Sequence, residues 1–234
     1  MKMIRKISIL TMVVFLLCIQ FIFAQSRTGY GRPLATYKAP EGFTIISYSE
    51  NWGTIPRLKE IRKELLSNFY SNEIKYLKTI YIYPDSPDGV LGYTHYDLRR
   101  DRRGNYVYKD NTYIEIFDAN NYVEIGDFAW VLAHEYGHHF TTYYLVTGEN
   151  RFFDQWKSTE YAKIRGISNN QKVRYQEETP FSQRQWDIME IAADDYVQLF
   201  GSPKAKRSKI YKDIQQRIQL GINNNSNYIY SFNM

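Results

Sequence analysis

The stretch Ala133-His134-Glu135-Tyr136-Gly137-His138-His139 contains the pattern His-Glu-x-x-His and holds three of the chain's four histidines. Side chains four positions apart lie one turn apart on a helix, so His134 and His138 face the same side and both can reach one metal ion. Glu135 is offset by one residue, so it can stand over a metal-bound water as a general base. The pattern predicts a catalytic zinc centre with His134 and His138 as ligands.

The surroundings of this motif distinguish a catalytic helix from the alternative, a surface helix with two solvated histidines. The segment 124–145 repeats apolar residues at helical spacing and shares one broad face with both histidines, which predicts a helix with a buried side. Gly148 is expected to end this helix. A surface helix with solvated histidines does not require a buried apolar face around the motif, whereas a catalytic helix does. We therefore favour the catalytic interpretation.

The third zinc ligand decides the class of enzyme, because a catalytic zinc has three protein ligands and an open position. Metzincins supply a histidine in the longer pattern H-E-x-x-H-x-x-G-x-x-H, but the two decisive positions here are Thr141 and Tyr144. His95 lies on a predicted strand, where we expect it to pack or to face a substrate. His139 points about 100° away around the helix from its neighbour. A downstream carboxylate is the remaining choice.

Glu190 has the setting expected of that carboxylate. It lies in an otherwise apolar helical window, residues 186–193, where an unpaired carboxylate costs free energy that metal coordination would remove. Asp194 follows four residues later on the same helical face and can accept the free ring N–H of a zinc-bound histidine. The other downstream glutamates lie in a predicted loop, follow the helix end too closely or have no such aspartate: Glu177, Glu178, Glu149 and Glu160.

With H-E-x-x-H on one helix and Glu190-x-x-x-Asp194 on a later one, the chain resembles the gluzincin type of zinc metallopeptidase, to which thermolysin belongs. The resemblance covers residues 112–201 and implies a compact, zincin-like domain. It implies that His134, His138 and Glu190 bind zinc, that Glu135 activates water, and that Asp194 supports a ligand histidine. The chain departs from thermolysin because no histidine follows Glu190.

That departure means that another group must stabilise the oxyanion of the transition state. Gluzincins commonly place a tyrosine donor in the loop before the glutamate helix, so the resemblance points to Tyr175. Arg174, Tyr161 and Tyr196 compete for this role. The resemblance also makes residues 112–118 an edge strand that receives an extended peptide, with an internal sheet strand as the alternative.

Periodicity along the chain predicts one α+β domain over residues 51–220. We expect an N-terminal backing helix, a small and mostly antiparallel sheet, the active-site helix and C-terminal helices. The expected helices are 55–70, 124–145, 152–164, 182–200 and 204–220. The expected strands are 79–83, 90–98, 106–108 and 112–118, with a turn at 84–89 and a charged hairpin tip at 99–105.

The two ends of the chain are expected to lie outside this domain. Residues 1–24 begin with Lys2, Arg5 and Lys6, continue with an apolar run and end at Ala24, as a signal peptide does. The alternative is an uncleaved membrane anchor, and either predicts an exported protein, secreted or extracytoplasmic. Residues 25–50 carry several glycines and prolines and predict an extended lead-in, and residues 221–234 predict a polar tail.

Composition excludes several classes of protein. The chain has 234 residues, of which 44% are hydrophobic, enough for a packed core and too many for intrinsic disorder. Its single cysteine, Cys18, lies in the targeting segment, which excludes a disulfide-stapled fold and the upstream cysteine ligand of peptide deformylases. Removing three N-terminal charges from the net +5 leaves +2, so no nucleic-acid partner is expected. Asp85 and Asp88 lie in a turn that either holds calcium or forms without an ion.

The sequence therefore predicts an exported, single-domain, monomeric zinc endopeptidase that cleaves peptide or protein substrates with Glu135 as its base. Two alternatives stay open. One is a binding protein that keeps the zincin scaffold without cleaving. The other is a zinc hydrolase of a non-peptide amide at the cell surface.

Overall fold

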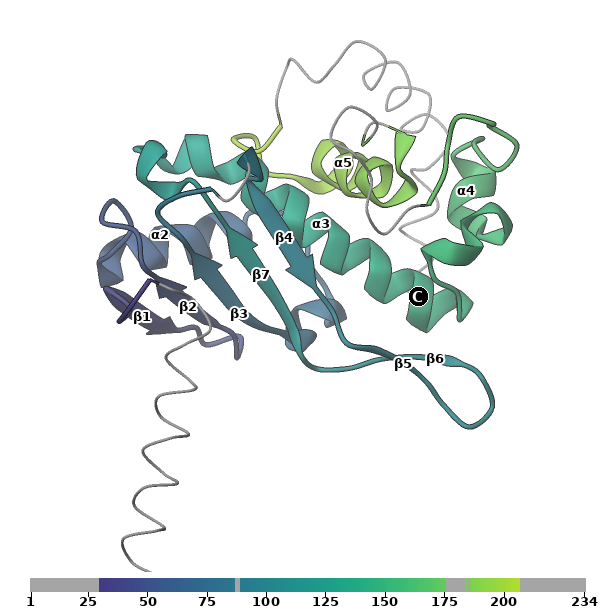
Figure 1. Ribbon diagram of the computed structural model, residues 1–234, viewed down its shortest axis with the longest axis horizontal. Helices are drawn as coiled ribbons and strands as arrows, with labels where there is room; N and C mark the ends of the chain where they lie inside the picture. The colour runs from purple at the N-terminus through teal and green to yellow at the C-terminus, as the bar shows by residue number, and fades with distance from the viewer. Residues whose placement is uncertain (1–29, 87–88, 176–183, 185, 207–234) are drawn as a thin grey trace, which may run out of the picture. The chain divides into compact units, whose positions relative to one another are not determined.

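The computed structural model describes residues 30–86, 89–175, 184 and 186–206 (Figure 1). The chain divides into a unit over residues 1–33 and a unit over residues 34–234, and the described helices and strands belong to the second. The predicted signal peptide, the polar tail, Asp88 and most of the predicted helix 204–220 lie outside the described residues. Among the residues that are described, no helix combines the length and apolarity of a transmembrane span.

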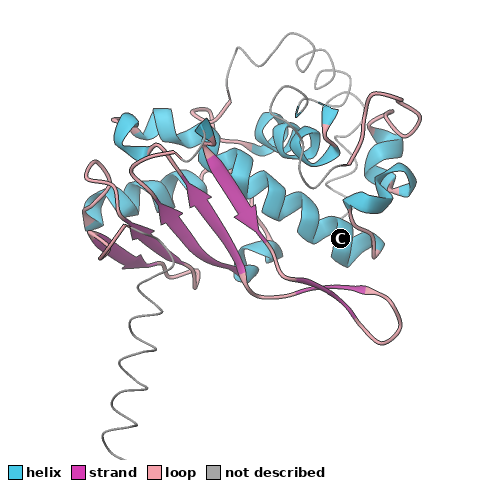
Figure 2. Cartoon of the chain, in the orientation of Figure 1, coloured by secondary structure: helices cyan, strands magenta, loops and turns pink. Residues whose placement is uncertain are grey.

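A five-stranded sheet forms one layer of an α+β fold (Figure 2). Its strands are β1 (Ala35–Lys38), β2 (Thr44–Ser47), β3 (Leu77–Ile82), β4 (Gly92–His95) and β7 (Thr112–Ile116), in the order β1-β2-β3-β7-β4. β2–β3 and β3–β7 are parallel, whereas β1–β2 and β4–β7 are antiparallel. The prediction of a mostly antiparallel sheet is therefore wrong. For β2–β3 the physical reason is the crossover helix α2 (Ile55–Leu65), because such a connection places consecutive strands parallel. β7 is parallel to β3 because it enters the sheet between β3 and β4.

The extended lead-in predicted for residues 25–50 is also wrong, because residues 35–47 form β1 and β2. A tight turn joins the two strands: Gly42 has a φ of 108° and donates its N–H to the Ala39 carbonyl at 3.1 Å. Ile45 and Ser47 are buried and alternate with more exposed neighbours, as strand periodicity requires. The glycine and proline of this segment thus mark a hairpin turn and not a linker.

β4, and not residues 112–118, is the sheet edge next to the helix that carries the H-E-x-x-H motif. β7 lies between β3 and β4, so the expected edge strand is wrong and its alternative, an internal strand, is what the structure has. One face of β7 packs in the core, because Thr112, Ile114 and Ile116 are all fully buried. The predicted strand 90–98 is broken, and its end forms β5 (Leu98–Arg100), which pairs with β6 (Tyr106–Tyr108) as a separate hairpin.

Helices cover one face of the sheet, and aromatic rings cover the other. α2 and α3 (Ile125–Glu149) pack on the buried alternation of the strands and form the core with it. On the opposite face, the Tyr83 ring stacks between Tyr48 and Phe117, with centroids 5.3 Å away on each side. The faces of these rings pack against one another, so we interpret the row of stacked rings as a structural cover for this side of the sheet.

α3 is the long central helix and runs four residues beyond the predicted end. Gly148 lies inside its last turn, and the helix ends at Asn150, whose φ of 52° is left-handed. Asparagine is among the few residues other than glycine that adopt this conformation readily, which is why the glycine rule misplaced the end. At the other end, Glu124 and Asp127 form a reciprocal capping box.

Shorter helices complete the domain around α3. The predicted helix 152–164 is a 3-10 turn, Phe153–Ser158, followed by α4 (Glu160–Ile164), because Thr159 caps α4 by accepting from the Ala162 N–H at 3.1 Å. α5 (Ile188–Phe200) begins where Asp187 accepts from the Met189 N–H at 2.9 Å and ends before Gly201. The backing helix α2 ends at Leu65 and not near Tyr70.

A buried ion pair anchors the segment after α4 to α5. Arg165 contacts Asp195 through Nε at 2.6 Å and Nη2 at 3.2 Å, and the Tyr161 hydroxyl donates to the same carboxylate at 2.8 Å. The two charged side chains are only 2% and 6% exposed. Burial raises the pKa of Asp195 although Arg165 opposes the shift. Asp195 follows Asp194 directly, so this pair also fixes the helix that carries the predicted site residues.

We expect Arg165→Met to lower the free energy of unfolding by about 3–5 kcal/mol, because it leaves the Asp195 carboxylate buried without its cation. Urea denaturation followed by circular dichroism measures the change. Lys163→Met removes an exposed pair with Glu160 and is the control, with an expected loss of about 0–1 kcal/mol. Equal losses in the two variants would contradict the assignment of Arg165 as the anchor.

Candidate metal centre

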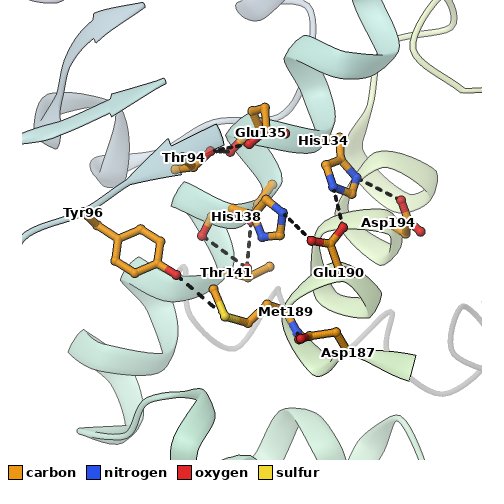
Figure 3. A network of polar contacts seen from close by, with 11 residues as sticks. Thr94, Tyr96, His134, Glu135, His138, Thr141, Asp187, Met189, Glu190 and Asp194 are labelled. Atoms are coloured by element: carbon orange, nitrogen blue, oxygen red, sulfur yellow. Dashed lines mark hydrogen bonds and ion pairs between the residues drawn. The ribbon is translucent and has the colours of Figure 1, made fainter. Parts of the chain in front are cut away.

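Two helices bring three ligand atoms together. α3 contributes His134 and His138 and α5 contributes Glu190, and one potential ligand atom from each lies within 4.8 Å of the others (Figure 3). The Glu190 carboxylate lies 3.2 Å from Nε2 of His134 and 3.9 Å from Nε2 of His138. The histidines are each 8% exposed. This buried group could hold a metal ion.

The close crossing of α3 and α5 depends on Gly137, which lies between the two histidines. A Cβ atom at this position would be 2.9 Å from the carbonyl oxygen of Ala193 and 3.1 Å from its Cα, and both are backbone atoms. Only a residue without a side chain lets the helices approach this closely. Gly137 therefore brings the carboxylate of α5 within reach of the imidazoles of α3.

Asp194 lies on the outer side of His134, as the helical spacing from Glu190 predicts. The ring donates from Nδ1 to Oδ1 of Asp194 at 3.0 Å, while its Nε2 faces Glu190. A carboxylate on the far nitrogen of a ligand histidine fixes the ring's orientation and tautomer and increases its basicity. His134 is thus held with Nε2 directed toward the other two candidate ligands.

We expect Asp194→Asn to weaken metal binding, with zinc as the probe, by about 10- to 100-fold, since the amide keeps the shape of the side chain but is a weaker acceptor. Competition with a chromophoric chelator measures the dissociation constant. Asp154→Asn alters an exposed aspartate outside the site and serves as the control. A dissociation constant equal to that of the control would show that His134 does not depend on Asp194.

Burial and charge set different protonation states for the two histidines. Burial lowers the pKa of His138 to about 4, which leaves the neutral imidazole that a metal requires. Burial also opposes a charge on His134, but Asp194 and Glu190 outweigh it and raise the pKa of this ring well above its usual value. Burial alone would raise the pKa of Glu190, yet the two histidines lower it to about 2. A bound metal would therefore take the place of a proton that His134 shares with Glu190.

The nitrogen atoms of His138 are consistent with a cation-binding role. Its Nδ1 is buried and has no hydrogen-bond partner among the described residues, and the 3.9 Å between Nε2 and Glu190 is too long for a hydrogen bond. The nitrogen that faces Glu190 is therefore not held by a hydrogen bond to that carboxylate, and a cation between Nε2 and Glu190 would bind both. Two imidazoles and a carboxylate suit a divalent transition metal, though they do not by themselves select one.

Glu135 lies beside the three candidate ligands but is not part of their group. It is 5% exposed, and its Oε2 lies 2.8 Å from the Thr94 hydroxyl on β4. Burial raises the pKa of Glu135 to about 7, although the charge on His134 and the Thr94 hydrogen bond act in the opposite direction. A carboxyl group with a pKa near neutrality can both take up and release a proton at physiological pH.

The other two histidines lie outside the metal group, as expected. His139 is fully buried, with Nδ1 2.7 Å from the Tyr108 hydroxyl and Nε2 2.8 Å from the Glu73 carbonyl. His95 lies on the outer face of β4, where it contacts Glu115 at 2.8 Å and stacks on Tyr113. Neither ring has the orientation of a fourth ligand.

The oxyanion donor stays a prediction. The Tyr175 ring lies 5.8 Å from the Phe152 ring, in the segment before α5. Two of its competitors have hydroxyls committed elsewhere: Tyr161 donates to Asp195 at 2.8 Å and Tyr196 to the Phe69 carbonyl at 2.5 Å. The hydroxyls of Tyr161 and Tyr196 thus have partners outside the candidate metal group.

Sequence reasoning missed three residues that act on this site. Thr94 and Gly92 contact Glu135 from β4. The positive charge of Arg184 also lowers the pKa of Glu190, by less than the two histidines do. Gly92 and Thr94 stand two apart in a predicted strand, so a shared face was foreseeable. That this face contacts Glu135 was not foreseeable, because the contact depends on the order of strands in the sheet.

The site is thus a buried pair of imidazoles and a carboxylate. A second carboxyl group, that of Glu135, lies beside them and has a pKa of about 7. Comparisons with known proteins found no matching family model, no matching curated protein and no matching solved structure.

Proposed function

We propose that this chain is an exported, zinc-dependent endopeptidase of the gluzincin type, with a zincin-like fold, that acts as a monomer on peptides or proteins. The observation that carries the proposal is the buried group of His134, His138 and Glu190 with Glu135 next to it but outside it. The motifs H-E-x-x-H on α3 and Glu190-x-x-x-Asp194 on α5 support it from the sequence. Export rests on the signal-like residues 1–24.

His134, His138 and Glu190 would hold the zinc, with Asp194 fixing His134 from behind. Two histidines and a glutamate are the ligand set of several zinc peptidases, and they leave a coordination position open. When bound there, zinc supplies Lewis acidity, which polarises a carbonyl and lowers the pKa of water to about 7. Acidic and imidazole donors in a buried site favour this chemistry over a purely structural role.

Glu135 would move the proton. Hydrolysis needs a base that takes a proton from the attacking water as the oxygen bonds to the carbonyl carbon. It then needs an acid that gives this proton to the amide nitrogen as the C–N bond breaks. A pKa of about 7 suits Glu135 to both tasks, and burial is the cause of that value. The charges of His134 and Glu190 both act on the pKa of Glu135, as expected of a carboxyl group that lies near the candidate metal position.

The edge strand β4 supports an extended peptide as the substrate. Among the described strands β4 pairs with β7 alone, and its inner face contacts Glu135 through Gly92 and Thr94. A peptide that adds to the unpaired edge of β4 by main-chain hydrogen bonds would pass close to that carboxyl group. We therefore assign to β4 the role first expected of residues 112–118.

Mass spectrometry of a mixed peptide library incubated with the zinc-loaded protein tests the proposal. We expect cleavages that disappear when a chelator removes the metal and return when zinc is added back. Tight zinc binding without cleavage would instead favour a non-catalytic binding protein or a hydrolase of non-peptide amides. Failure to bind zinc at all would reject the endopeptidase and the zinc hydrolase and would leave a binding protein that does not require the metal.

A further inference from the structure

We propose that Thr94 and Gly92 of the edge strand β4 are positioning residues that hold the Glu135 carboxyl group in its working orientation. The inference rests on the proposed role of Glu135 as the proton acceptor. It goes beyond that role because it assigns the orientation of the base to the strand that borders the site, and not to the helix that carries it.

The Thr94 hydroxyl joins two parts of Glu135. Its Oγ1 lies 2.7 Å from the backbone carbonyl oxygen of Glu135 and 2.8 Å from Oε2 of the same residue. A hydroxyl has one proton, so it donates to only one of these oxygens at a time, but it can also accept a proton. Thr94 can therefore donate to the carboxylate, or accept from the carboxylic acid while it donates to the carbonyl. The contact persists through both protonation states that a base must visit.

Gly92 closes the other side of the carboxyl group. A Cβ atom at this position would lie 2.6 Å from Cγ, 2.7 Å from Oε1 and 2.8 Å from Cδ of Glu135. These distances are shorter than real side-chain contacts, so the backbone of β4 passes directly against the Glu135 side chain. Oε1 is thus confined by Gly92 while Oε2 is held by Thr94.

The sheet fixes both contacts at once. Residues two apart on a strand face the same side, and β4 pairs with β7 with Gly92 opposite Ile116 and Thr94 opposite Ile114. The two isoleucines are fully buried in the core. The core therefore sets the position of β4, β4 sets the position of the carboxyl group, and Glu135 has little freedom to rotate away from the candidate ligands (Figure 3).

Three variants of the full chain test the proposal: Thr94→Val, Thr94→Ser and Gly92→Ala. We expect Thr94→Val to lower kcat by about 10- to 100-fold with KM and zinc affinity nearly unchanged, because misplacing a reacting group by about 1 Å costs up to about 100-fold. Thr94→Ser keeps the hydroxyl and should restore most of kcat. Gly92→Ala should lower kcat about 100-fold, because the Glu135 side chain must move away from the added methyl group, and thermal melting checks that the variant stays folded.

Crystal structures of the same variants give a readout that does not depend on activity. We expect a displaced or doubled Glu135 conformer in Thr94→Val and Gly92→Ala and the original conformer in Thr94→Ser. Gly126→Ala is the matched control, because a Cβ atom there meets nothing within 4 Å. An unmoved Glu135 in Thr94→Val, or a Thr94→Ser variant as impaired as Thr94→Val, would overturn the proposal. If the wild type cleaves no peptide while Glu135 still moves as expected, the positioning role stands and the endopeptidase proposal fails.

Discussion

Zinc affinity is expected to fall by about 100- to 1,000-fold in a Glu190→Gln variant, with the fold retained. In zinc-finger peptides, zinc binds with an apparent free energy of about 10–16 kcal/mol, which divided among their four ligands is about 2.5–4 kcal/mol for each ligand. Since about 1.4 kcal/mol corresponds to a factor of ten, the loss of one ligand gives the expected change. Glutamine keeps the size of Glu190 but removes the negative charge that lies 3.2 Å from His134. Competition with chelators of graded affinity measures the change.

Glu160→Gln is the matched control for this variant. Glu160 is also a downstream glutamate on a helix, but its side chain is 55% exposed and pairs with Lys163 at the surface. Its zinc affinity should equal that of the wild type. If Glu190→Gln binds zinc as tightly as this control, Glu190 is not a ligand, and the assignment of the third ligand must move to another residue. Thermal melting of both metal-free variants checks that neither loses its fold.

The metal group was predictable because its signals are local. The spacing of His134 and His138 depends only on the pitch of one helix, and Glu190 stood out as a carboxylate inside an apolar helical window. The meeting of the two helices was inferred from a family resemblance and from chemistry, and the structure brings the three side chains together. Gly137, which permits that meeting, lies inside the motif but gives no sign of its partner in the sequence.

The sheet was predicted less well because its order is a long-range property. β1 and β2 have four residues each, and the turn between them contains a proline and a glycine that are equally typical of a linker. Without β2, the helix α2 could not be recognised as a crossover, so the parallel pairs were missed. β7 was expected at an edge because of the family resemblance, yet β4 occupies that edge. The contact of Thr94 with Glu135 follows from this order and was invisible for the same reason.

Glu135→Gln is expected to lower kcat by about 100- to 10,000-fold, the range that general acid–base catalysis contributes. The amide has almost the same shape, so it should fit between Gly92 and Thr94, but it cannot take up a proton at neutral pH. Glu135 lies outside the group of three candidate ligands, so the variant should bind zinc as the wild type does. Cleavage of a fluorogenic peptide chosen from the library measures kcat, and chelator competition measures zinc affinity.

The value of this variant lies in separating proton transfer from metal binding. Glu115→Gln is its control, because Glu115 is a glutamate of the sheet's outer face that contacts His95 and not the metal group. If Glu135→Gln loses turnover, keeps its zinc affinity and differs in this from Glu115→Gln, the proton transfer is assigned to Glu135. The variant has then lost a buried carboxyl group with a pKa of about 7 but not the metal. Full turnover in Glu135→Gln would remove Glu135 from the mechanism. The contacts with Gly92 and Thr94 would then be explained by packing against α3.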